Sequence, residues 1–196
     1  YDRVFEAAPV FRAEKHNTTR HLNEYTSLDF EMGYIKGFED IMEMEAELLR
    51  AIFGLLRESY AKELKILKVT LPEISKIPSV RFDEAKVLIS EKYNRKIRNP
   101  YDLEPEEEAL IGRYFQEEYQ SDFVFVTHYP SKKRPFYAMD DPADPKLTLS
   151  FDLLFKGMEI TTGGQRIHDY TELVKKMEAR GMDYDSFTNY LMIFKY

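Results

Sequence analysis

The sequence predicts a mixed α+β fold in which an antiparallel sheet is flanked by helices. Three observations support this class. Segments with the polarity pattern of strands lie toward both ends of the 196-residue chain, and segments with helical periodicity lie between them. The composition is 43% hydrophobic and 14% aromatic, which is too rich in large apolar side chains for a disordered chain and provides enough material for one core.

The composition also excludes several classes of protein. The chain has 28 Lys and Arg residues against 35 Asp and Glu residues, a formal net charge of −7, which argues against a protein that coats nucleic acid through net positive charge. It has no cysteine, which excludes a disulfide framework, a thiolate zinc site and a thiol nucleophile and favours the reducing cytoplasm. No run approaches the roughly 20 apolar residues of a membrane span, so we expect no membrane association.

A β-hairpin is predicted near the N-terminus. Its strands span Val4 to Phe11 and Tyr25 to Met32, and a polar stretch over residues 14–20 lies between them. The second strand alternates apolar and polar residues, which predicts one face toward a core and one polar face. The residues predicted for the core face are Leu28, Phe30 and Met32.

Helices are predicted in the middle of the chain. A wide apolar stripe predicts a long helix over Phe38 to Leu64, and further helices are predicted over Phe82 to Tyr93 and Pro105 to Tyr119. The last of these opens with a proline and three glutamates, which suit a first helical turn. Residues from about 65 to 120 are therefore predicted to be a helical insertion between two parts of the sheet.

The C-terminal part, residues 121–196, is predicted to contain strands and then helices. The predicted strands are residues 123–126, 136–139, 147–155 and 158–167. The predicted helices are residues 170–180 and 184–194, with Gly181 ending the first of them.

The polar face of the hairpin is a first candidate site. Arg12 and Glu14 share a face of the first strand, and Tyr25, Ser27 and Asp29 share a face of the second. Arginine pairs with phosphate, an aromatic ring stacks on a base and carboxylates pair with amines, so this face suits a charged planar ligand. A solvated outer face of a sheet has a similar composition, and the residues alone leave both interpretations open.

A second candidate site surrounds two glycines in residues 159–168. Glu159, Thr162, Arg166 and His168 lie close to them in the sequence. Arg166 suits a bidentate contact with a carboxylate, and Glu159 and Thr162 offer the hard oxygens that Mg²⁺ prefers. The glycines allow a backbone to approach a ligand closely, but they equally suit a simple turn or bulge.

Together these segments resemble the class II aminoacyl-tRNA synthetases, and most closely the archaeal-type aspartyl-tRNA synthetases. Residues 11–31, FRAEKHNTTRHLNEYTSLDFE, are similar to motif 2 of that family. Residues 151–153, FDL, and residues 157–166, GMEITTGGQR, are similar to its amino-acid-binding segment. The stretch from Tyr129 to Tyr137 is similar to the aspartyl and asparaginyl subgroup. The resemblance spans nearly the whole chain and implies the catalytic-domain fold of class II.

The resemblance implies an ATP site on the hairpin. Arg12 is implied to be the catalytic residue that holds the α-phosphate of ATP. Glu14 is implied to contact the edge of the adenine, and Tyr25 to stack on its ring. His21, with Arg20 beside it, is implied to reach toward the γ-phosphate.

The resemblance also implies sites for aspartate, Mg²⁺ and tRNA. Ser27 and Asp29 are implied to lie near the α-amino group of aspartate, and Arg166 to contact its side-chain carboxylate. The acceptor end of tRNA(Asp) is implied to face the loop tip at residues 15–19. The implied Mg²⁺ ligands are Glu159 and Thr162, with Asp152 as a helper.

The family's pattern extends beyond this sequence at both ends. An OB domain and motif 1 precede motif 2 in the family, and motif 3 carries a further ATP-binding arginine. The resemblance therefore implies that residues 1–196 are part of a catalytic domain whose intact form is a homodimer. We expect these residues alone to be inactive.

Several functions stay open from the sequence. A fragment of an aspartate-tRNA ligase is favoured, because asparaginyl enzymes usually have Gly-Gly-Ser-Gln-Arg where this chain has residues 163–166, GGQR, without the serine. The alternatives are an asparaginyl-tRNA synthetase, a tRNA-independent asparagine synthetase paralogue, and a non-catalytic module that retains the fold.

Overall fold

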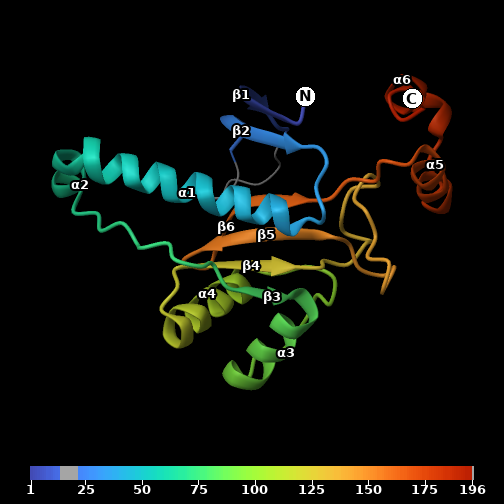
Figure 1. The fold of residues 1–196 in the computed structure, drawn as a ribbon. Coiled ribbons are helices and arrows are strands. Elements are labelled where there is room, and N and C mark those ends of the chain that lie inside the picture. The colour runs from blue at the N-terminus through green and yellow to red at the C-terminus, as the bar shows by residue number, and fades with distance from the viewer. Residues whose placement is uncertain (14–21, 196) are drawn as a thin grey trace. The chain divides into compact units, whose positions relative to one another are not determined.

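The computed structural model describes residues 1–13 and 22–195. The chain divides into two compact units, residues 1–41 and residues 42–196. Figure 1 follows the elements of both units along the chain by colour.

The first unit contains an antiparallel hairpin formed by β1 (Arg3–Phe11) and β2 (Glu24–Met32), which confirms the predicted strands. The apolar face that the sequence assigns to a core is not buried, since Phe5 is 79% exposed and Leu28 is 54% exposed. A two-stranded sheet has no further layer of its own to cover that face. The prediction of a core face is therefore wrong for Leu28, whereas Phe30 and Met32 are half-buried.

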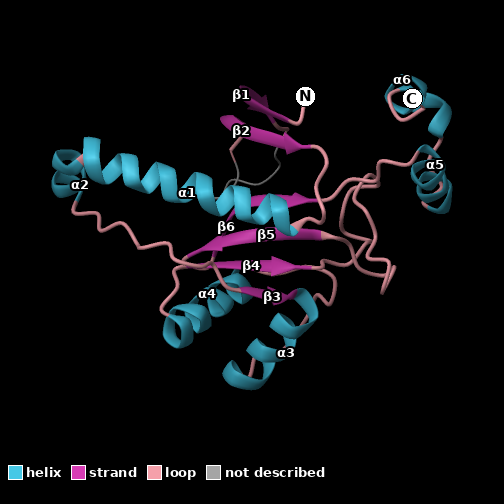
Figure 2. Cartoon of the chain, in the orientation of Figure 1, coloured by secondary structure: helices cyan, strands magenta, loops and turns pink. Residues whose placement is uncertain are grey.

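The second unit is built on a four-stranded sheet with the strand order β3-β4-β5-β6 (Figure 2). The strands β4 (Phe123–Thr127), β5 (Ser150–Phe155) and β6 (Met158–Gly164) are antiparallel neighbours. The edge strand β3 (Ser79–Arg81) is parallel to β4 and was not predicted, because three residues are too few to show alternation. Antiparallel pairing thus dominates, in agreement with the predicted fold class.

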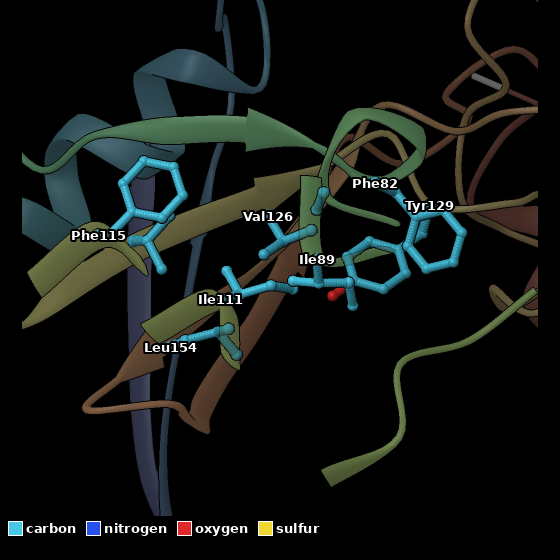
Figure 3. Close-up of a cluster of buried hydrophobic side chains, with 9 residues drawn as sticks. Phe82, Ile89, Ile111, Phe115, Val126, Tyr129 and Leu154 are labelled. Atoms are coloured by element: carbon cyan, nitrogen blue, oxygen red, sulfur yellow. The ribbon is translucent and has the colours of Figure 1, made fainter. Parts of the chain in front are cut away.

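Helices cover both faces of this sheet. The helices α3 (Phe82–Tyr93) and α4 (Pro105–Tyr119) have the predicted bounds. On one face their apolar side chains enclose a core with β4 and β5, in which Ile89, Ile111 and Leu154 are almost fully buried (Figure 3). On the other face Phe53 of α1 (Glu39–Ser59) packs on Phe123, with 6.0 Å between the ring centroids. The sheet is therefore the buried centre of the second unit.

The predicted long helix over residues 38–64 is divided into two helices. The first is α1, and the second is α2 (Ala61–Leu67). Between them Tyr60 has φ −124° and ψ 24°, outside the helical region. A single non-helical residue that is neither proline nor glycine hardly changes the apolar periodicity, so the periodicity did not predict the break.

The C-terminal segment contains α5 (Tyr170–Ala179), the 3₁₀ helix η1 (Tyr184–Phe187) and α6 (Thr188–Met192). Gly181 has φ +66°, which agrees with the predicted end of the preceding helix. The predicted strand over residues 136–139 is wrong, because the N–H of Ala138 donates to Pro135 within a turn. One β-bridge joins Ala138 to Arg166. Within the described ranges, no helix has the length and apolar character needed to cross a membrane.

Candidate active site

The hairpin brings four of the predicted residues to one face. Directly opposite residues of an antiparallel pair lie on the same side of the sheet, and the register sets Val10 opposite Tyr25. Arg12 follows two residues after Val10, and its Cζ lies 5.6 Å from the centroid of the Tyr25 ring. Ser27 and Asp29 continue the same face of β2. A cation and an aromatic ring are therefore adjacent on this face.

Three predicted ATP-binding residues cannot be placed on this face. Glu14, Arg20 and His21 lie outside the described residues. Their assignment stays a prediction that depends on the resemblance of residues 11–31 to motif 2.

The second unit brings the predicted Mg²⁺ ligands to one face of β5 and β6. Asp152 is opposite Thr162, and Leu154 is opposite Glu159. In a regular strand, two residues that are three positions apart point to opposite faces. A bulge at this point of the register shifts the pairing by one residue, so Glu159 shares the face of Thr162 and Asp152. Bulges beside functional sites commonly redirect a side chain in this way.

Arg134 is a residue at this face that the sequence did not predict. Its Nη2 donates to Asp152 Oδ1 at 2.7 Å, and its Nη1 donates to Thr162 Oγ1 at 3.0 Å. Its Cζ lies 4.0 Å from the centroid of the Tyr129 ring. Arg134 lies in the stretch that resembles the aspartyl and asparaginyl subgroup, but contacts 18 and 28 residues away leave no local pattern.

The residues on this face fit Mg²⁺ in part. Nowhere in residues 1–13 or 22–195 do three or more His, Asp or Glu side chains form a group able to hold a metal ion. Mg²⁺ is usually held by one or two carboxylates together with water and substrate phosphates. Glu159 and the Thr162 hydroxyl suit that arrangement, whereas Asp152 already forms an ion pair with Arg134. The assignment of Glu159, Thr162 and Asp152 as ligands stays a prediction.

Arg166, the predicted carboxylate-binding residue, lies just beyond the end of β6. Its Cζ lies 4.7 Å from the centroid of the Tyr137 ring. The backbone around it is fixed, because Ile167 N–H donates to Tyr137 O at 2.8 Å and Met139 N–H donates to Gln165 O at 2.9 Å. Stacking on an aromatic ring orders a guanidinium for a bidentate contact.

The glycine pair beside Arg166 is required by packing within the chain. A Cβ on Gly163 would lie 2.4 Å from Cζ of the Phe151 ring. A Cβ on Gly164 would lie 2.9 Å from the backbone of Leu149 and Ser150. The bulge lies between Leu153 and Leu154 of β5, whereas Gly163 and Gly164 pair with Phe151 and Ser150. The two glycines are therefore not part of the bulge. The glycines thus allow β5 and β6 to approach closely.

Two buried titratable groups lie near Asp152. Burial raises the pKa of Glu45, the charge of Asp152 raises that pKa further, and a hydrogen bond from Thr161 lowers it. Burial also raises the pKa of Tyr129 well above its ordinary value, and Asp152 acts in the same direction. Both groups should therefore stay uncharged to a higher pH than they would in water.

An open pocket of about 360 Å³ lies between residues 73–79 and the end of α4. Its lining includes Lys76, Tyr119 and Gln120, and none of the predicted site residues that the structure describes. The predicted site residues that the structure describes therefore lie on the hairpin, on the β5–β6 face and just beyond β6 rather than in this pocket.

Comparison with known proteins identifies the family. The family model described as tRNA synthetases class II (D, K and N) matches residues 1–196. The chain belongs to this family. Membership of the class II synthetases confirms the resemblance stated from the motifs.

Curated relatives of this class II synthetase chain are similar to it over its whole length. An aspartate-tRNA(Asp/Asn) ligase from Aeropyrum pernix is 47% identical over 197 residues, which cover 100% of the chain and 45% of that relative. An aspartate-tRNA(Asp) ligase from Pyrococcus abyssi is 40% identical over 196 residues, which cover 100% of the chain and 44% of that relative. The chain thus spans less than half the length of these relatives.

Solved structures confirm the fold class. An aspartyl-tRNA synthetase from Entamoeba histolytica has a TM-score of 0.93 and 31% identity, covering 100% of this chain and 41% of that one. An asparaginyl-tRNA synthetase from Pyrococcus horikoshii, complexed with asparaginyl-adenylate, has a TM-score of 0.88 and 30% identity, covering 100% of this chain and 45% of that one.

Proposed function

We propose that this chain forms part of the catalytic domain of an aspartate-tRNA ligase, which makes aspartyl-adenylate from aspartate and ATP and transfers the aspartate to tRNA. The observation that carries the proposal is the Arg166 guanidinium, which is stacked on Tyr137 and held by a fixed backbone. Such a group suits the side-chain carboxylate of aspartate. The names of relatives that are 40–47% identical to the chain support the same substrate.

Adenylate formation requires charge neutralisation rather than a protein nucleophile. The α-carboxylate of aspartate attacks the α-phosphorus of ATP, and pyrophosphate leaves. Positioning of the two substrates and cations near the phosphate lower the barrier to this step. We assign Arg12 to the α-phosphate and Tyr25 to the adenine ring, because the hairpin sets this cation and this ring side by side.

Aspartate is held at its two ends in this proposal. Asp29, with Ser27 beside it, pairs with the α-ammonium group, and Arg166 pairs with the side-chain carboxylate. Asparagine has a neutral amide in place of that carboxylate, so it leaves the charged donors of Arg166 without a matching partner. Selection of aspartate over asparagine is therefore a matter of charge.

The proposal includes Mg²⁺ and further partners. Mg²⁺ supplies positive charge to the phosphates of ATP, and Glu159 and Thr162 would hold it together with phosphate oxygens. The acceptor end of tRNA(Asp), a homodimer and a cytoplasmic location complete the proposal. Membership of the class II synthetases and the names of the relatives support these partners.

Aspartate-dependent exchange of pyrophosphate into ATP tests this function. We expect the natural full-length protein to catalyse the exchange with aspartate, and with a kcat/KM for asparagine that is lower by about 100-fold or more. Absence of exchange with aspartate would contradict the proposal. We expect residues 1–196 alone to show no exchange, and robust exchange by them would contradict that expectation.

An asparaginyl-tRNA synthetase is the second candidate, because the Pyrococcus horikoshii structure with asparaginyl-adenylate matches the chain at a TM-score of 0.88. The same assay separates the two functions. A kcat/KM for asparagine above that for aspartate would support the second candidate and reject the first.

A further inference from the structure

Arg134 joins two residues that the resemblance to class II synthetases assigns to Mg²⁺. Its two terminal nitrogens donate to Asp152 Oδ1 at 2.7 Å and to Thr162 Oγ1 at 3.0 Å. Its side chain is 15% exposed and that of Asp152 is 8% exposed, so the ion pair is shielded from water. The guanidinium of Arg134 therefore already places a positive charge between the side chains of Asp152 and Thr162.

The surroundings of Arg134 hold the guanidinium in place. Its Cζ lies 4.0 Å from the ring centroid of the buried Tyr129. Arg180, the residue that follows α5, fixes the backbone of the same loop, since it donates to Arg134 O at 2.9 Å and to Ser131 O at 2.6 Å. The Nε atom of Arg134 is buried, and the described part of the chain offers it no hydrogen-bond partner. The interactions of the guanidinium are thus concentrated on Asp152 and Thr162.

The charge of Arg134 determines what Asp152 can bind. A buried carboxylate needs a compensating positive charge. Arg134 provides that charge permanently, and its guanidinium takes up Oδ1 of Asp152. A divalent cation at the same corner would meet both electrostatic repulsion from Arg134 and a ligand oxygen that is already engaged.

We propose that Arg134 is a positioning residue that acts as the built-in cation of this face, fixing Asp152 and Thr162 and preventing a divalent cation from coordinating Asp152. A cation that binds here then depends on Glu159 and on oxygens of a bound phosphate ligand. The role of Arg134 in catalysis rests on the proposed function. The contact between the guanidinium and Asp152 does not depend on it.

Titration of the natural full-length protein with Mn²⁺, without nucleotide, tests this inference by calorimetry or by electron paramagnetic resonance. Arg134→Met removes the charge and keeps an apolar chain of similar length. We expect Arg134→Met to bind Mn²⁺ at least tenfold more tightly than the unmodified protein, because Asp152 loses its compensating cation. We expect the gain to disappear in the double variant Arg134→Met with Asp152→Asn.

Arg180→Met is the matched control, because it loosens the same loop without removing the partner of Asp152. We expect it to leave Mn²⁺ affinity within about twofold of the unmodified protein. An equal gain in Arg180→Met, or no gain in a folded Arg134→Met, would overturn the proposal.

Asp152→Asn by itself provides a test that does not require Arg134→Met to fold. With Arg134 present, we expect this variant to change Mn²⁺ affinity by less than twofold. A tenfold loss would show that Asp152 is already a ligand and would overturn the proposal. Because these readouts are metal binding, they are independent of the exchange assay, and failure of one can be told from failure of the other.

Discussion

The hairpin and the β5–β6 face carry candidate site residues in different ways. On the hairpin, Arg12 is exposed, and its neighbour Tyr25 comes from the adjacent strand. On the β5–β6 face, Asp152 is 5% exposed, and its partner Arg134 comes from a loop outside the sheet. The difference indicates that the hairpin side chains contribute little to the fold, whereas Asp152 and Arg134 are part of its packing.

The largest expected effect is on the hairpin. Arg12→Ala should lower aspartate-dependent pyrophosphate exchange by about 100-fold or more, which corresponds to roughly 3 kcal/mol, because a cation that stabilises transition-state charge is lost. Arg3→Ala, which removes an exposed arginine of β1, is the control and should retain the exchange. Near-normal exchange by Arg12→Ala in the full-length protein would reject its assigned role.

A smaller effect is expected for Arg166, the residue proposed to bind the carboxylate of aspartate. Arg166→Gln should lower kcat/KM for aspartate by about 10- to 100-fold, because charge-assisted hydrogen bonds to the substrate are lost. Steady-state kinetics with each substrate varied would show this as a change for aspartate with the KM for ATP little altered. Arg166→Lys keeps the charge and should lose less. A change confined to ATP would contradict the assignment.

Packing beneath the β5–β6 face gives a stability test. Gly163→Ala should lower the free energy of unfolding by about 1–3 kcal/mol, because its Cβ would overlap the Phe151 ring. Gly54→Ala is the control, since a Cβ there meets nothing within 4 Å inside helix α1. That control should raise stability by up to about 1 kcal/mol. Urea unfolding measures both, and equal effects would contradict the close approach of β5 and β6.

The smallest expected effect is a pH-dependent change in stability caused by Glu45, which lies on the opposite face of the sheet. Folding raises the pKa of Glu45, mainly through burial, so its contribution to stability is fully present below the unfolded pKa and is lost as pH rises through the folded pKa. Glu45→Gln removes this titration. The stability of the unmodified protein relative to Glu45→Gln should therefore fall as the pH is raised from about 4, near the unfolded pKa, through the folded pKa of Glu45. A constant difference in unfolding midpoint across that range would contradict this prediction.

Local patterns were sufficient to predict much of the fold. A β-prone apolar run and an alternating run placed the two hairpin strands to within one residue, and the proline and glutamates at the start of α4 placed its first turn. The exposed apolar face of the hairpin was not predictable, because alternation shows which residues share a face but not whether anything covers it. The break at Tyr60 was missed because its conformation leaves the apolar stripe intact.

The candidate site was predictable where its residues belong to a motif. The resemblance supplied Arg12, Glu159 and Arg166, but it did not supply the bulge that aligns Glu159 with Thr162. A bulge depends on the pairing of two strands, so one strand's sequence does not show it. Arg134 was missed for a related reason, since its partners are brought to it only by the folded sheet.

The contrast between the two regions is tested most directly by the free energies of unfolding of Arg12→Ala and Asp152→Asn, measured side by side in the full-length protein. We predict a change within about 0.5 kcal/mol for Arg12→Ala, because the side chain is exposed. We predict a loss of about 2 kcal/mol for Asp152→Asn, because the buried Arg134 loses its charged partner. Equal losses in the two variants, or a larger loss for Arg12→Ala, would contradict the account.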